Sequence, residues 1–187
     1  MLSFRPLDAA TWNDFERLLG ERGGSGGCWC MLWRRSPAEF RAGKGEGNRA
    51  AMRRLAETGP PPGILAYDGE RAIGWCALAP RGDYPGLARS RVLKPLDDRP
   101  VWSVSCFYID KASRGRGVSV ALLEAAVDYA RSQGATIVEG YPVEPNDKHY
   151  PAVFAWTGTA KTFTRAGFAE CLRRSPTRPI MRRSLEH

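Results

Sequence analysis

Arg114-Gly115-Arg116-Gly117-Val118-Ser119 is the stretch of this chain that says most about its fold. The turn lies between an apolar run, Val101 to Ile109, and an amphipathic run, Val118 to Ser132, so it joins a predicted strand to a predicted helix. The first N–H groups of a helix have no partner within the helix, and the helix dipole adds partial positive charge there. Glycines let a phosphate approach the backbone, and the two arginines add paired donors. We therefore expect a pyrophosphate here; the alternative is a tight turn without a ligand.

The elements beside the turn predict a strand, a helix and a second strand. Strict alternation in the first strand places on one face Trp102, Val104, Cys106 and Tyr108, and on the other Val101, Ser103, Ser105, Phe107 and Ile109. Both faces can be covered, as in a central strand. We expect the helix to end at Ser132 with Gly134 as its cap, and Thr136 to Tyr141 to form the next strand. Together these segments make a βαβ unit.

Periodicity and turn residues predict the other elements. Strands are expected over 2–7, 64–67, 72–78, 169–173 and 180–183, and helices over 12–19, 48–57 and 159–165, with a further helix starting at Ser36-Pro37-Ala38-Glu39. Asp68-Gly69 predicts a tight hairpin turn with positive φ angles. The stretch from Pro80 to Pro100 is expected to be irregular, and its candidate functional side chains are Arg81, Asp83, Tyr84, Asp97 and Asp98.

The composition is typical of a soluble globular protein, with 43% hydrophobic and 26% charged residues in a chain of 187. We expect one domain over residues 1–184, with Leu185-Glu186-His187 as the remnant of an expression tag. Five cysteines are odd in number and lack CxxC spacing, so we expect neither a disulfide framework nor a metal site. No apolar leader and no long apolar run is present, which predicts a reduced, cytoplasmic protein without a membrane segment.

Two other nucleotide-binding patterns fit the turn less well. Gly115-x-Gly117 with Glu139 further on is similar to a dinucleotide-binding fingerprint. However, Val120 occupies the place of the third glycine, and Asp110 to Arg114 separates the strand from the first glycine. The chain beyond Tyr141 also lacks the alternating elements of a doubly wound sheet. A nucleoside-triphosphate P-loop is not expected because the sequence has no G-x-x-x-x-G-K-[ST].

The turn resembles that of the GCN5-related N-acetyltransferase (GNAT) family, R/Q-x-x-G-x-G/A, with Ser119 as its one departure. The resemblance implies an α/β (α+β) fold: a mixed, mainly antiparallel sheet with a splayed central strand pair and helices on both faces. It also implies that acetyl-CoA is the co-substrate and that its pantetheine pairs with backbone near Phe107 and Ile109. The residues expected to bind the cofactor are Phe107, Tyr108, Ile109, Arg114, Gly115, Arg116, Gly117, Val118, Ser119 and Phe163.

The resemblance implies direct acetyl transfer from the thioester to a primary amine, which requires a base to remove the ammonium proton. Many family members use a tyrosine at the position of Phe163 to protonate the leaving thiolate, so that acid is absent here. Candidate catalytic residues are Tyr150, His149, Tyr108 and Ser105, with Tyr141 and either Asp97 or Asp98 as further options. Cys106 as an acyl-carrying nucleophile is a less favoured alternative, because the sequence identifies no partner base.

The acceptor is expected to be an amine of a small molecule or peptide, in an aromatic pocket built from Trp29, Trp33, Tyr84, Tyr141 and Trp156. The cluster Cys28 to Trp33 can be a wall of that pocket or simply of the core. The alternative function is a non-catalytic acyl-CoA-binding or regulatory domain. The net charge of +8 also fits a nucleic-acid partner, but no aromatics are interleaved with the C-terminal arginines, so we expect neither nucleic acid nor membrane as a partner; a homodimer is possible.

Overall fold

The computed structural model describes residues 1–144 and 155–185. The helices in this part of the chain are α1 (Trp12–Leu19), α2 (Pro37–Ala42), α3 (Glu46–Thr58), α4 (Pro85–Arg89), α5 (Val118–Ser132) and α6 (Ala160–Arg165), with the 3₁₀ turns η1 (Arg81–Asp83) and η2 (Lys111–Ser113). The strands are β1 (Leu2–Pro6), β2 (Gly63–Asp68), β3 (Arg71–Pro80), β4 (Trp102–Ile109), β5 (Ile137–Gly140), β6 (Ala169–Arg173) and β7 (Pro179–Ser184).

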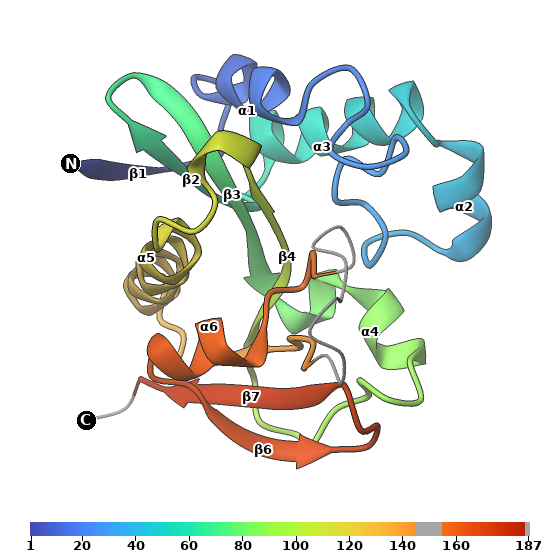
Figure 1. Ribbon diagram of the computed structural model, residues 1–187. Coiled ribbons are helices and arrows are strands. Elements are labelled where there is room, and N and C mark those ends of the chain that lie inside the picture. Colours follow the sequence, from blue (N-terminus) through green and yellow to red (C-terminus); the bar gives the residue numbers. More distant parts are fainter. Residues whose placement is uncertain (145–154, 186–187) are drawn as a thin grey trace.

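These strands form a seven-stranded sheet in the order β1-β2-β3-β4-β5-β7-β6. Within it, β4 and β5 are parallel and the other neighbours are antiparallel. Figure 1 shows β1 and β2 in the upper part of the molecule, β3 and β4 running down through its middle, and β7 and β6 in the lower part. The expected mixed, mainly antiparallel sheet is therefore confirmed.

The parallel pair separates soon after it begins. Pairing between β4 and β5 runs from Trp102↔Val138 to Val104↔Gly140, where β5 ends, while β4 continues to Ile109. The register of β4 against β3 also shifts: Val104 pairs with Leu78, but Cys106 pairs with Ala77. Ser105 is thus the extra residue of a β-bulge, a feature that bends a strand and increases its twist. The splayed central pair follows from this geometry.

The bulge also corrects the predicted faces of β4. Val104 and Phe107 both lie in the core beneath α5, whereas Cys106 lies in the core on the opposite side of the sheet. Strict alternation had placed Val104 and Cys106 together. It was wrong here because one extra residue reverses the facing of every side chain after it.

Helices cover both faces of the sheet. One core packs α5 and α6 against the sheet through residues such as Leu122, Phe163 and Val104. The other packs α1, α3 and the segment before α2 against the opposite face, with Phe15 and Trp75 at ring-centroid distance 4.7 Å. A third, smaller core around Tyr84, Leu87 and Tyr141 lies under α4.

Local sequence signals place most element ends. Ser36 forms the capping box of α2 with Glu39, and α5 spans Val118–Ser132 as predicted, with Gly134 at φ 83° behind it. Two expectations were wrong in detail. Within the hairpin turn Gly69 has positive φ but Asp68 does not, because the two-residue loop begins at Gly69. The stretch after Pro80 also contains regular turns, η1 and α4, where an irregular segment was expected.

Candidate functional site

A cavity of about 310 Å³ opens at the N-terminus of α5. The predicted turn contributes most of its first wall, and the lining residues are Ile109, Ser113, Arg114, Gly115, Gly117, Val118, Ser119, Val120, Thr159, Lys161, Thr162 and Arg165. Five of the six turn residues therefore line one cavity; the exception is Arg116. The geometry is that expected of an anion site at a helix N-terminus.

The backbone of the turn needs glycine at two positions. Gly115 has φ 76°, and Gly117, the N-cap residue of α5, has φ 78°. A Cβ added at either position would have open space around it, so the demand for glycine comes from the left-handed backbone and not from crowding. The exposed Arg114 donates from Nε to the Ile109 carbonyl at 3.1 Å, which ties its guanidinium to the end of β4. Arg116 instead lies 3.5 Å from Asp68 in an exposed ion pair.

The opposite wall of the cavity comes from α6 and was missed by sequence reasoning. Thr159 caps this helix by accepting from the Thr162 N–H at 3.3 Å, which directs its first turn toward the cavity. Lys161 and Arg165, four residues apart, are exposed cations on one side of α6. Their spacing was visible in the sequence, but their position opposite Arg114 depends on how α6 packs beside α5.

The separated end of β4 lies next to a segment that precedes α6. The Phe107 N–H donates to the Trp156 carbonyl at 2.6 Å, so a donor expected to face pantetheine has a protein partner in this structure. Phe163 is fully buried and packs edge to face on Phe107 at 6.0 Å. A Cβ at Gly140 would lie 2.0 Å from the Phe163 ring, so that glycine makes room for the ring. Tyr108 points to the opposite face of β4, away from Phe107.

The aromatic residues predicted to form one pocket lie in three different parts of the structure. Trp33 and Trp156 are partly exposed and lie together at 6.1 Å. Trp29 is buried against Trp12 and Phe15, so the core interpretation holds for it, and its inclusion in a pocket was wrong. Tyr141 was wrongly placed as well, because its hydroxyl bonds to the buried Glu139 carboxylate.

Arg34 is a further residue that the sequence did not single out. Its guanidinium lies over the Tyr84 ring at 4.6 Å and donates to the Tyr84 hydroxyl at 3.4 Å, and Asp83 is 3.7 Å away. The Arg34 side chain is only 7% exposed, and its Nε, like Trp33 Nε1, is buried without a hydrogen-bond partner in the described part of the chain. Tyr84 is itself fully buried, and burial raises its pKa.

The two catalytic candidates within residues 1–144 and 155–185, Ser105 and Tyr108, have different surroundings. Ser105 is 1% exposed, so it is buried within β4. Tyr108 is partly exposed on the face of β4 that bears Cys106. His149 and Tyr150 lie outside the described residues. Cys106 is a weak candidate nucleophile, because its hydrogen bond with Cys30 and its burial raise its pKa well above the usual value.

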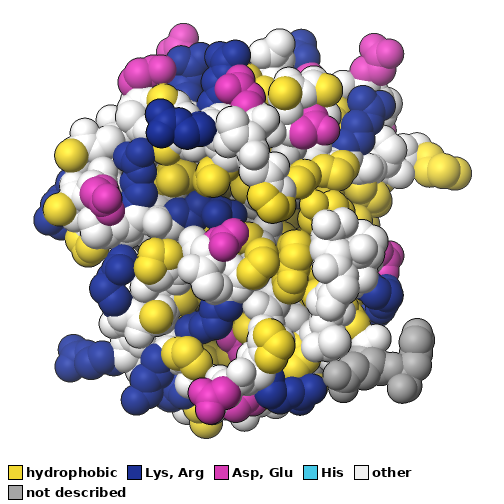
Figure 2. All heavy atoms as spheres, turned by 180° about the vertical axis from the view of Figure 1, so that it is seen from behind, with side chains coloured by type: hydrophobic (Ala, Val, Ile, Leu, Met, Phe, Trp, Pro, Cys, Tyr) yellow, Lys and Arg dark blue, Asp and Glu magenta, His cyan; other side chains and the backbone are white. Residues whose placement is uncertain are grey.

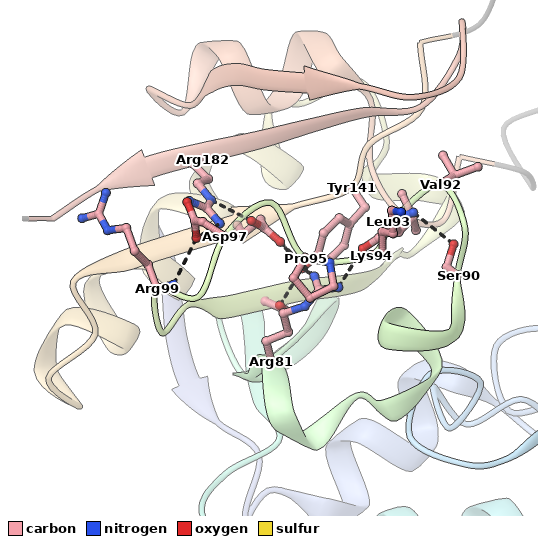
Figure 3. Close-up of polar contacts among 12 residues, drawn as sticks. Arg81, Ser90, Val92, Leu93, Lys94, Pro95, Asp97, Arg99, Tyr141 and Arg182 are labelled. Carbon is pink, nitrogen blue, oxygen red and sulfur yellow. Dashed lines mark hydrogen bonds and ion pairs between the residues drawn. The ribbon is translucent and has the colours of Figure 1, made fainter.

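A buried ionic network occupies the paired end of β4 and β5 (Figure 3). Glu139, fully buried, accepts from Arg81 at 2.9 Å, from Arg182 at 2.7 Å and from the Tyr141 hydroxyl at 2.7 Å. Ser103 lies 2.7 Å from the same hydroxyl. Burial and the Glu139 carboxylate raise the pKa of Tyr141, so this hydroxyl stays a donor. The network lies next to the point where β4 and β5 separate. Arg81 and Tyr141 are therefore part of the buried structure there.

Comparison with known proteins identifies the class to which this fold and cavity belong. The model of the acetyltransferase (GNAT) family matches residues 29–152, a span that includes β4, the turn and α5. The chain therefore belongs to the GNAT family of acetyltransferases. No curated protein matches the sequence.

Solved structures share the fold at low sequence identity. A GCN5-related N-acetyltransferase from Kribbella flavida is 22% identical, with a TM-score of 0.56 and 98% of each chain covered. The yncA protein of Salmonella typhimurium, solved with its cofactor acetyl-CoA, is 15% identical, with a TM-score of 0.54 over 99% of this chain and 94% of that one. The NatC complex bound to Gag peptide and CoA is 12% identical, with a TM-score of 0.55 and 99% of each chain covered.

Proposed function

We propose that this acetyltransferase binds acetyl-CoA with its pyrophosphate in the cavity at the N-terminus of α5 and transfers the acetyl group directly to a primary amine of a small molecule or peptide. The observation that carries the proposal is the convergence of two cationic walls on one cavity. Arg114 and the turn backbone form one wall, and Lys161 and Arg165 form the other. A group with several negative charges is what such an arrangement recognises.

The turn and α6 contact the pyrophosphate from different sides. The N–H groups at the start of α5 point at the pyrophosphate, and Arg114 contributes charge while its Nε stays bonded to Ile109. Lys161 and Arg165 reach the phosphates from the other side. The expected contacts of Phe107, Tyr108, Ile109 and Phe163 with the cofactor remain predictions that place the pantetheine along the free edge of β4.

Pantetheine binding along β4 requires one rearrangement. The Trp156 carbonyl has to leave the Phe107 N–H, because one N–H cannot serve both groups well. Once released, that N–H is suited to hold the thioester oxygen as negative charge develops on it during attack by the amine. Phe163 carries no acidic proton, so the CoA thiolate leaves as the anion or takes its proton from solvent. Among the described candidates for the base, Tyr108 is partly exposed and Ser105 is buried.

The charge of +8 also fitted a nucleic-acid ligand. On the face shown in Figure 2, however, Lys and Arg side chains alternate with Asp and Glu and border a band of hydrophobic atoms. Nucleic-acid binding uses a more continuous basic surface. Among the described residues, no helix combines the length and apolar character needed to span a membrane.

The binding step is tested by Gly117→Val with Gly134→Val as its control. Both glycines have left-handed φ, 78° and 83°, a Cβ added at either would have open space around it, and they flank opposite ends of α5. The backbone strain is thus matched, but only Gly117 borders the cavity. We expect calorimetric titration with CoA to show binding by the control and none by Gly117→Val. Equal affinities in two folded variants would overturn the assignment.

The transfer step needs a separate assay, because a non-catalytic acyl-CoA-binding domain would also bind CoA. Acetyl-CoA is incubated with a panel of small amines and short peptides, and free CoA thiol is measured. We expect thiol release that depends on both the amine and the wild-type turn. CoA binding without release by any amine would favour the non-catalytic alternative.

A further inference from the structure

Two cysteine thiols from distant parts of the chain meet beside the bulge of β4. Cys30 Sγ lies 3.3 Å from Cys106 Sγ, across a sequence separation of 76 residues. Cys30 belongs to the segment between α1 and α2, and Cys106 follows the bulged Ser105 and precedes Phe107. The pair therefore connects a surface segment to the strand edge on which acetyl transfer is proposed.

The backbone holds Cys30 in this position by an unusual conformation. Trp29 and Cys30 have φ 47° and 57°, and they are the two described non-glycine residues with positive φ. Consecutive left-handed residues with large side chains persist only where surrounding packing determines them. Here the Trp29 ring is buried against Trp12 and Phe15, and the Trp29 N–H donates to the Gly23 carbonyl at 3.1 Å. The position of the Cys30 sulfur is thus set by the N-terminal core.

The surroundings of Cys30 favour its thiolate. Trp75 Nε1 donates to Cys30 Sγ at 3.2 Å, and Cys30 Sγ is hydrogen-bonded with Cys106 Sγ at 3.3 Å. The hydrogen bond with Cys106 is the main cause that lowers the pKa of Cys30; the hydrogen bond from Trp75 and the charge of Arg34 act in the same direction, against the opposing effect of burial. Burial instead raises the pKa of Cys28 to about 11 and also raises that of Cys76. Cys30 is partly exposed as a residue, whereas Cys106 is 8% exposed.

Geometry does not favour a metal at this cluster. Within residues 1–144 and 155–185, no group of three or more His, Cys, Asp or Glu side chains is arranged to hold a metal ion. Cys76 lies in the core on the other face of the sheet from Cys106. What remains is a close pair of thiols, one in a partly exposed residue and one in a buried residue.

We propose that Cys30 and Cys106 are an oxidisable pair that a hydroperoxide converts into a disulfide, tying the segment before α2 to β4. The Cys30 thiolate attacks one peroxide oxygen, which breaks the O–O bond, gives a sulfenic acid and releases hydroxide that becomes water. The Cys106 sulfur then attacks the Cys30 sulfur, the S–S bond forms, and the sulfenic hydroxyl leaves as water with the Cys106 proton. Two thiols lose two electrons, and one hydrogen peroxide is reduced to two waters.

The disulfide would move the residues next to Phe107. An S–S bond is about 2.05 Å long, so the sulfurs must approach by more than 1 Å from their distance of 3.3 Å. Cys106 is bonded directly to Phe107, whose N–H is proposed to hold the thioester oxygen. A misplacement of about 1 Å at a reacting centre can cost about a hundredfold in rate. This consequence rests on the proposed function, whereas formation of the disulfide rests on the geometry of the pair alone.

The chemical test uses the full-length reduced protein treated with graded hydrogen peroxide. Five cysteines are free, and we expect the thiol count in denaturant to fall by two per chain at low peroxide. Non-reducing digestion and mass spectrometry should identify one cross-linked peptide pair that contains Cys30 and Cys106. A first product that is a sulfinic acid at Cys30, or that joins Cys171 of two chains, would overturn the proposal, as would a disulfide from Cys28.

Single-cysteine variants distinguish oxidation of the Cys30–Cys106 pair from nonspecific oxidation of the other cysteines. Cys30→Ser and Cys106→Ala should each abolish the two-thiol loss, while Cys171→Ser, at an exposed position on β6, should oxidise as the wild type does. If a core variant is poorly folded, the wild-type mass spectrum still decides the question, because it needs no substitution. Loss of the cross-link in Cys171→Ser would contradict the assignment.

The functional arm compares acetyl transfer before and after oxidation. We expect kcat/KM to fall about tenfold to a hundredfold in the cross-linked protein and to recover with dithiothreitol, with CoA affinity changed much less. A cross-linked enzyme with unchanged turnover would refute the functional consequence. If the reduced enzyme transfers no acetyl group to any amine, the proposed function fails, while the thiol count and the cross-linked peptide still report on the pair.

Discussion

Two arginine-rich regions of this protein have opposite roles. In the buried network, the Arg81 and Arg182 side chains are 13% and 11% exposed, and both bond to Glu139, which is fully buried. Arg81 also donates to the Leu93 carbonyl at 2.7 Å, and Arg182 to Asp97 at 2.7 and 3.0 Å. At the turn before α5, Arg114 is exposed and Arg116, 59% exposed, meets Asp68 only at 3.5 Å.

The difference shows what makes an arginine structural or available. A buried guanidinium is costly unless carboxylates and carbonyls satisfy its donors, and donors that are satisfied in this way are not available to a ligand. The turn keeps its cations at the surface, beside helix N–H groups that also lack internal partners. We therefore expect substitutions in the network to change stability and substitutions around the cavity to change CoA affinity.

The largest effect is expected for Glu139→Gln. The amide keeps the shape of the side chain but removes the charge that two buried arginines share, so the free energy of unfolding should fall by about 3 kcal/mol. Urea denaturation followed by circular dichroism measures this. Glu170→Gln breaks an exposed pair with Arg173 and should barely move the midpoint. If the free energy of unfolding falls equally in the two variants, the buried network contributes no more to stability than an exposed ion pair does.

Arg114→Ala should weaken CoA binding about tenfold with little change in the unfolding midpoint, because it removes a charge-assisted contact at the surface. Calorimetric titration gives the affinity. Arg131→Ala is the control, since Arg131 lies on the last turn of the same helix and pairs with Asp128 at 2.6 Å. A loss of affinity as large in Arg131→Ala would point to a general effect of net charge.

A smaller effect is expected for Lys161→Ala on the α6 wall. A single exposed ammonium should contribute a few-fold to CoA affinity at low salt, and the contribution should shrink as salt screens it. Titrations at two ionic strengths measure both quantities, with Lys44→Ala, between α2 and α3, as the control. If Lys161→Ala and Lys44→Ala behave alike at low salt, α6 does not form part of the phosphate site.

The smallest effect concerns acid stability at the edge of the network. The hydrogen bond from Arg182 is the main cause that lowers the pKa of Asp97 below its ordinary value. The unfolded state then binds more protons than the folded state near pH 4, so this contribution is complete above the unfolded pKa of about 3.9 and is lost as pH falls through the folded pKa. Asp97→Asn should therefore show a shallower loss of stability on acidification in urea unfolding series. If Asp97→Asn loses stability on acidification as steeply as the wild type does, the Asp97–Arg182 pair is separated by water in solution.

The turn and its helix could be read from the sequence because their signals are local. The bounds of α5, the helix start at Ser36 and the succession of strands along the chain followed from periodicity and from glycine, proline and serine at fixed offsets. The sequence predicted a ligand site at the turn residues for the same reason. The bulge at Ser105 was not predicted, because an inserted residue leaves no mark in a strand that is apolar on both faces.

Other parts of the site depend on contacts between distant residues. Trp29 and Trp33 are close in sequence and equally aromatic, yet one lies in the core and the other against Trp156. Lys161 and Arg165 are ordinary surface cations until α6 packs beside α5. Glu139 was noted only as part of a rejected dinucleotide fingerprint, and its partners Arg81 and Arg182 come from segments on either side of it in the chain.

Neighbouring residues are enough to specify the strand, turn and helix around Arg114 to Ser119, because backbone conformation and helix capping are local properties. Packing between distant segments is needed to specify which arginines are neutralised, which cations line the cavity, and that Cys30 Sγ lies 3.3 Å from Cys106 Sγ. Each of these properties depends on residues that packing brings together. The type of side chain at one position does not predict how far it lies from a partner many residues away in the sequence.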